Sequence, residues 1–69
     1  MKAYTATIYA RPGTLLLGGV KRVTSTPFEF EHMTHDWLYA ASDQPNYSHS
    51  HIKEVNVPKE KVILASQCK

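Results

Sequence analysis

Residues 28–42, FEFEHMTHDWLYAAS, decide the fold because they hold both the clearest periodic pattern in the chain and the most ambiguous one. In the first five of these residues, glutamates alternate with aromatic side chains. Phe28, Phe30 and His32 fall on one face of an extended backbone, and the two glutamates fall on the other. Strict alternation is typical of a β-strand with one buried face. We therefore predict a strand over residues 28–32, with its aromatic face in the core.

The rest of this stretch fits two conformations. In a helix, Thr34 would be the N-cap, Asp36 would complement the helix dipole, and Trp37 with two alanines would form one face. In a strand, Trp37 and Tyr39 would lie on the same side of the backbone. Aromatic residues favour a strand, whereas alanines favour a helix. We favour the strand and keep one short helix from Thr34 to Ser42 as the alternative.

The remaining sequence is a series of short extended segments separated by turn residues. Residues 3–10 alternate with a period of two, and Arg11-Pro12-Gly13 ends them because proline fixes φ and glycine permits a turn. Gly18-Gly19 indicates a bulge or bend inside a second segment. The predicted extended segments outside 28–42 are residues 3–10, 14–24, 47–57 and 62–65, with a 3₁₀ turn over 58–61.

Turn signals about every ten residues between short strands are typical of a small barrel or sandwich. Strand follows strand without a convincing crossover helix, so the pairing should be antiparallel. We predict a mainly β fold: a small antiparallel barrel of five to six strands, or a strongly bent sheet. The short helix over residues 34–42 is its optional element.

Two segments resemble SH3-type barrels. Asp36-Trp37-Leu38-Tyr39-Ala40 is similar to their acidic, Trp-initiated strand, and Val57-Pro58-Lys59-Glu60-Lys61-Val62 is similar to their closing proline, 3₁₀ turn and valine strand. The resemblance implies an SH3-like barrel, with Trp37 and Pro58 as groove members. Ala6-Thr7-Ile8-Tyr9-Ala10 keeps at most one tyrosine of the peptide groove, and Lys61 replaces another. The resemblance therefore implies a scaffold and does not extend to proline-rich peptide recognition.

Length limits what the chain can do. Its 69 residues form a single domain, 42% hydrophobic, and such a chain buries only about 60% of its unfolded surface. That leaves little interior for an enclosed catalytic pocket. The longest aliphatic run is Leu15-Leu16-Leu17, which is too short to span a membrane.

Cysteine use indicates the compartment. The single cysteine, Cys68, excludes an internal disulfide framework. The amino terminus has no signal-peptide pattern, so we expect a reducing, cytoplasmic location. Residues 67–69 are expected to form a frayed tail, with Cys68 as a solvated thiol.

Charge gives a mixed signal. Eight Lys and Arg against six Asp and Glu leave a formal net charge of +2. Among the basic residues, only Lys21-Arg22 and the pair Lys59 and Lys61 cluster, whereas a dedicated nucleic-acid binder usually shows a basic stripe. We expect a dipolar surface without one dominant sign.

Four histidines make a metal site a weak candidate. His49 and His51 would point to the same face of a strand, about 6.5–7 Å apart along it. If the strand holding His32 lay nearby, three imidazoles could bind zinc and leave a position open. A polar, solvated Ser-His-Ser-His stretch is the favoured interpretation. We therefore predict no metal site and no cofactor.

Catalysis has no support from the motifs. Ser48 and Ser50 neighbour histidines in sequence, but a triad needs convergence in space and an oxyanion hole. No Gly-x-Ser-x-Gly elbow or phosphate-binding loop is present. Glu29 and Glu31 share a strand face, where paired acids are most often solvated. We expect no catalytic residues and no enzymatic activity.

Aromatic and basic residues offer a binding surface. Tyrosine, tryptophan and arginine dominate protein interfaces, and aromatic residues beside cations also stack with single-stranded bases. Trp37 could equally fill the core. The candidate binding residues are Trp37, Tyr39, Tyr9, Tyr47, Lys21 and Arg22.

We expect a small non-enzymatic binding or self-assembling β module that acts through protein–protein contacts, with a protein partner or a second copy. Its size suggests a regulatory or accessory protein of a bacterium or phage. A nucleic-acid-binding barrel is the first alternative, and convergence of Lys21, Arg22, Lys59 and Lys61 with Tyr9 or Tyr39 would favour it. A histidine-based metal protein is the second.

Overall fold

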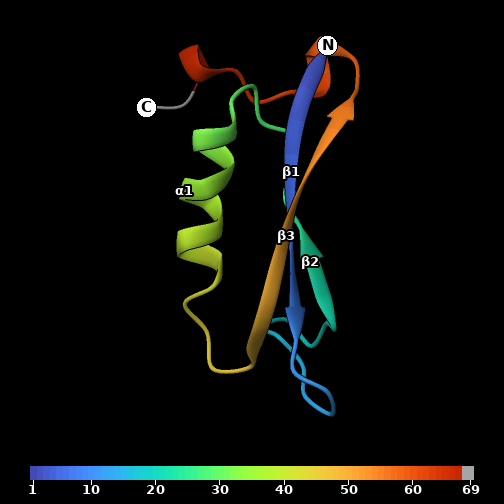
Figure 1. Cartoon of the computed structure of the whole chain (residues 1–69), viewed down its shortest axis with the longest axis vertical. Coiled ribbons are helices and arrows are strands. Elements are labelled where there is room, and N and C mark those ends of the chain that lie inside the picture. Colours follow the sequence, from blue (N-terminus) through green and yellow to red (C-terminus); the bar gives the residue numbers. More distant parts are fainter. Residues whose placement is uncertain (68–69) are drawn as a thin grey trace.

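The computed structural model describes residues 1–67 and places three antiparallel strands in one sheet, with a helix along one face (Figure 1). The strands are β1 (Lys2–Ala10), β2 (Arg22–Thr24) and β3 (Tyr47–Asn56), in the order β2-β1-β3. The helix α1 spans Glu31–Ala41, and two 3₁₀ turns, η1 (Lys59–Lys61) and η2 (Ala65–Gln67), follow β3. Strand β1 is central, so it positions every other element.

The predicted barrel of five to six strands is wrong, because residues 1–67 form an open sheet of three strands and one long helix. The extended segments predicted over residues 3–10 and 47–57 are confirmed as β1 and β3, and the 3₁₀ turn is confirmed as η1. Residues 62–65 contribute only a single bridge, between Ile63 and Phe28, before η2 begins. Too few strands therefore remain to close a barrel.

The segment predicted as extended over residues 14–24 is mostly a loop, and only Arg22–Thr24 forms a strand. Leu16 and Val20 pair across a tight turn in which Gly18 and Gly19 have φ values of 89° and 73°. Residues with side chains rarely adopt this left-handed backbone, so the two glycines reverse the chain here. The predicted bend is present, although it closes a loop and does not curl a strand.

The strand predicted over residues 28–32 is wrong, and so is the strand favoured over residues 34–42. Phe28 alone pairs with β1, opposite Tyr4, and α1 already begins at Glu31. The chain adopts the helical alternative, three residues longer at its start than predicted. Phe30 is 46% exposed and His32 is also exposed, so the expected aromatic core face does not form.

The helix forms because its buried side chains repeat with a helical period. Met33 and Thr34 are buried, and the residues one and two turns later on the same face are half-buried: Trp37, Leu38 and Ala41. Thr34 lies inside the helix and is not its N-cap; Phe30 holds that position with an extended backbone. Glu31 in the first turn complements the helix dipole.

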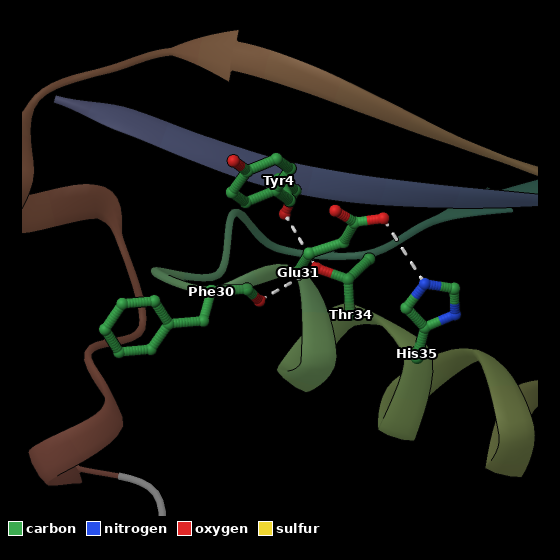
Figure 2. A network of polar contacts seen from close by, with 5 residues as sticks. All are labelled: Tyr4, Phe30, Glu31, Thr34 and His35. Carbon is green, nitrogen blue, oxygen red and sulfur yellow. Dashed lines mark hydrogen bonds and ion pairs between the residues drawn. The ribbon is translucent and has the colours of Figure 1, made fainter.

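Helix α1 packs on β1 through small side chains. Ala6 and Thr34 are both 0% exposed and Ile8 is 1% exposed, so the backbones approach closely there. The Thr34 hydroxyl lies 3.5 Å from both the Phe30 and the Tyr4 carbonyl oxygens (Figure 2). These long contacts satisfy a hydroxyl that would otherwise be buried without a partner.

Ser25 ends the pairing of β2 with β1. The Ala6 amide donates to the Ser25 hydroxyl at 3.0 Å, and the Ser25 amide donates to the Ala6 carbonyl at 2.7 Å. A side chain thus replaces a backbone acceptor where β2 stops. The chain then returns to β1 at Phe28, whose amide and carbonyl both bond to Tyr4.

The molecule has little core and a large surface. Its buried apolar residues within 1–67 are Ala3, Ala6, Ile8, Leu16, Met33 and Val62. The accessible surface is 4906 Å², compared with about 4,400 Å² for a typical monomer of this mass. The radius of gyration is 12.6 Å, against about 11 Å for a compact domain of this length. A flat, elongated shape of 37 × 23 × 17 Å accounts for both differences.

No helix among residues 1–67 is both long and apolar enough to cross a membrane. The predictions for Cys68 and for a frayed tail fall mainly on residues 68–69, which lie outside the described residues; Gln67 ends η2.

Replacing Ile8 with alanine should reduce the free energy of unfolding by about 2–5 kcal/mol, because it removes a fully buried side chain beneath α1. Leu17 has the same number of side-chain carbons and is 73% exposed, so Leu17→Ala should change stability by less than about 0.5 kcal/mol. Urea unfolding followed by circular dichroism measures both. Equal losses in the two variants would contradict the placement of the core.

Candidate binding surface

The sheet has one face that α1 leaves uncovered (Figure 1), and of the predicted binding residues Tyr9 and Arg22 lie on it. Paired residues in a sheet point to the same face, and β1 turns Tyr4, Ala6 and Ile8 towards the helix. The alternate side chains form what we call the open face. It consists of Thr5, Thr7, Tyr9, Arg22, Thr24, His49, His51 and Lys53.

Tyr9 is the centre of this open face. It lies opposite Arg22 of β2 on one side and opposite His49 of β3 on the other. The Tyr9 and His49 rings stack, with centroids 4.6 Å apart and planes inclined by 14°. The two rings lie face to face, with Tyr9 half-buried and His49 exposed, so a further ring could add only to an outer face of this stack. A cation, a phenol and an imidazole therefore lie in a row across three strands.

Hydroxyl groups and further cations continue the surface along the strands. The Thr7 and Thr24 hydroxyls are 3.0 Å apart and link β1 to β2. His51 and Lys53 are exposed and follow His49 along β3 on the same face. The open face does not extend to the start of β1. Ala3 lies on the same side of the strand but is fully buried, and η1 lies beside this end of β1 (Figure 1).

The loop that follows β1 brings two cations, Arg11 and Lys21, together near the end of the strand. Arg11 donates from its amide to the Asn46 carbonyl at 2.9 Å and from Nε to the Tyr47 carbonyl at 3.3 Å. The Ala10 amide donates to the Lys21 carbonyl at 2.9 Å. Arg11 and Lys21 also line an open pocket of about 430 Å³, together with Ala10, Pro12, Gly13, Thr14 and Leu15.

Tyr47 does not join the open face, although it has the same sequence phase as His49. The register between β1 and β3 shifts so that Tyr9 pairs with His49 but Ala10 pairs with Tyr47. This β-bulge moves Tyr47 to the helix-covered side, where its hydroxyl lies 3.1 Å from the Ser50 hydroxyl. A single extra residue thus reverses the face of the side chains beyond it.

Trp37 and Tyr39, on α1, lie apart from Tyr9. Trp37 is half-buried and lines a shallow groove with Phe28, Met33 and Asp36. Tyr39 is 86% exposed. A nucleic-acid surface was expected to bring Lys21, Arg22, Lys59 and Lys61 together with Tyr9 or Tyr39. Lys59 and Lys61 belong to η1, so of this set only Lys21, Arg22 and Tyr9 come together.

The histidines do not converge on a metal site. His32 stacks on Phe30 in the first turn of α1, with ring centroids 5.6 Å apart, whereas His49 and His51 lie on the open face. His35 pairs with Glu31 at 3.4 Å (Figure 2). Within residues 1–67, no three His, Cys, Asp or Glu side chains are grouped to hold an ion. The three-histidine hypothesis assumed a strand at His32, and that residue is helical.

Acidic groups are segregated from the open face. Four of the six carboxylates lie between residues 29 and 43, in α1 and its flanking segments. Glu54 lies on β3 opposite Tyr4 and so points to the helix-covered side, and Glu60 belongs to η1. The open face therefore carries cations and imidazoles without a carboxylate.

Sequence reasoning missed the contribution of Arg11, His49, His51 and Lys53 to a binding surface. The signal was present, since His49, His51 and Lys53 share one phase of an extended segment that β3 confirms. What was lacking was the pairing of that phase with Tyr9. Comparison with protein-family models, curated protein sequences and solved structures finds no match to this chain, so the SH3 resemblance stays a prediction.

The Tyr9–His49 pair should contribute about 0.2–1 kcal/mol of coupling energy to folding, as cross-strand aromatic pairs do. A double-mutant cycle with Tyr9→Ala and His49→Ala measures this energy by urea unfolding. The cycle of Tyr9→Ala with His51→Ala is the control, since His51 lies opposite Thr7. Strict additivity at Tyr9 and His49 would contradict the stacked geometry.

Proposed function

We propose that the chain is a small non-enzymatic binding module that pairs with a second copy of itself through the free edge of β3. The observation that carries this proposal is the length of that edge. Strand β3 has ten residues and pairs with β1 alone among the described strands. Alternate residues of an edge strand present unpaired backbone amide and carbonyl groups, which a further strand can bind.

The β3 edge has few of the features that prevent strand addition. Prolines, inward-pointing charges and bulges commonly block exposed edges. Residues 47–56 contain no proline, and the register shift lies at one end of the strand. Lys53 is the only lysine in β3, and Glu54 is its one charged residue on the helix-covered side. By contrast, β2 offers just three residues on the opposite edge.

Small core size supports association as well. A sheet with six buried apolar residues and more surface than a typical monomer gains stability when a partner covers part of it. Backbone pairing needs no large apolar patch, so a flat chain of this kind can use it. The expected mode of action, protein–protein contact with a second copy, is kept. The module that acts in this way is an open sheet and not a barrel.

We place the two-fold axis between the two β3 strands at Ile52, because the side chains that then lie opposite one another are compatible. In antiparallel pairing, Ile52 would meet its counterpart, and Ser50 would lie opposite Glu54. Ile52 is half-buried and faces the helix-covered side, opposite Ala6 of its own chain. The product is a continuous six-stranded sheet with both open faces on one side.

We retain a regulatory or accessory role and a cytoplasmic location, which the lone cysteine supports.

Light scattering should give a mass of twice 7.8 kDa for the native chain at micromolar concentration. Ile52→Lys and Ile52→Glu should each yield monomers, because each places two like charges opposite one another. An equimolar mixture of the two variants should recover the dimer mass, which unfolded variants would not do.

Val23→Lys is the matched control, since Val23 is also half-buried and faces the helix-covered side, but lies at the β2 edge. It should remain dimeric. A native chain that is strictly monomeric, or a mixture of Lys and Glu variants that stays monomeric, would contradict the proposal.

A further inference from the structure

We infer that the open face binds single-stranded nucleic acid, with a base adding to an outer face of the Tyr9–His49 stack and the surrounding cations holding the phosphates. This inference concerns the surface opposite α1 and does not depend on pairing at the β3 edge. It combines three observations: a sheet face that α1 does not cover, a one-signed charge distribution on that face, and a stacked aromatic pair at its centre.

The charge distribution favours a polyanionic ligand. Arg22 and Lys53 are exposed on the open face, and Arg11 and Lys21 begin and end the loop between β1 and β2. Within residues 1–67, none of the cations on the face is paired with a carboxylate. The ion pair in this part of the chain joins His35 to Glu31, and both residues belong to α1. The cations are therefore free to meet phosphates, and no carboxylate on the face would repel them.

The aromatic pair favours bases over a simple anion. Stacking positions His49 on one side of Tyr9, while Arg22 lies on the other. Any base presents a π-face that can extend such a stack, and an adjacent guanidinium adds a cation–π contribution. A phosphate-only or carboxylate-only ligand would leave the stack unused.

Geometry favours a single strand over a duplex. Proteins read the major groove with a helix or a two-stranded ribbon, and a broad sheet face does not enter it. Bases of a duplex are also already stacked on one another and cannot reach the Tyr9–His49 rings. Strands lie about 4.8 Å apart and rise about 3.3 Å per residue, so Arg22 to His49 spans about 10 Å and His49 to Lys53 about 13 Å. That area accommodates about two to four nucleotides.

Fluorescence anisotropy with a labelled oligothymidylate of about twelve nucleotides tests the inference at low salt. We expect saturable binding that weakens with salt, with a log–log slope of about −1.4 to −2.8 for two to four phosphate contacts. A duplex of the same length and inorganic polyphosphate should bind at least about tenfold more weakly, because neither offers unstacked bases.

Matched variants separate the open face from the rest of the surface. Tyr9→Ala should lower affinity about 5- to 150-fold and Tyr9→Phe should retain it, because the ring and not the hydroxyl stacks. Tyr39→Ala, at an exposed tyrosine on α1, should leave affinity unchanged. Lys53→Gln should reduce the size of the salt slope by about 0.7, and Lys2→Gln, on the helix-covered side of β1, should not, although both remove one charge.

Several results would overturn the inference. They are an absence of binding at low salt, equal affinity for polyphosphate or duplex, and equal losses in Tyr9→Ala and Tyr39→Ala. Circular dichroism of each variant confirms that the fold is retained. Because Ile52→Lys and Ile52→Glu act at the β3 edge, the mass measurement on those variants can fail while nucleic-acid binding persists, and the reverse also holds.

Discussion

The close packing of α1 against β1 is the constraint on which the rest of the structure depends. Ala6 and Ile8 from the strand and Thr34 from the helix leave almost no exposed surface between them. This chain has only one long helix among its described residues, and one helix can cover one face of a sheet. The opposite face is therefore left to solvent, and its side chains are free to serve another purpose.

Charge follows the same division of the molecule. The carboxylates gather mainly around α1 and its flanking segments, while Arg22, Lys53 and two histidines lie on the open face. A net charge of +2 hides this separation, because the two signs nearly cancel over the whole chain. The local field at the open face decides which ligand approaches it, and that field depends on strand register as well as on composition.

Sequence patterns identified the elements that bury one face along their whole length. Residues 3–10 alternate cleanly and form β1, and the phase of residues 49–53 correctly groups His49, His51 and Lys53. The helix was kept only as the alternative and its start was placed too late, because alternation over residues 28–32 hid the start of its period at Met33. That alternation spans only five residues, and packing of Met33, Thr34 and Trp37 over β1 outweighs local strand preference.

The candidate site was less predictable than the strands because it depends on contacts between distant segments. The pairing of Tyr9 with His49 spans forty residues of sequence, and no local pattern reports it. The bulge that removes Tyr47 from the open face is likewise set by register. Individual residues such as Tyr9, Lys21 and Arg22 were identified from their type, but their neighbours came from the topology.

If the sheet face opposite α1 is the working surface of the molecule, a short oligothymidylate must contact it. Proton NMR of the aromatic rings during titration with this oligonucleotide measures that contact. We expect shifts of the Tyr9 and His49 ring resonances, with the Tyr39 ring on α1 unaffected. Shifts confined to Tyr39 and Trp37, with Tyr9 and His49 unchanged, would contradict it.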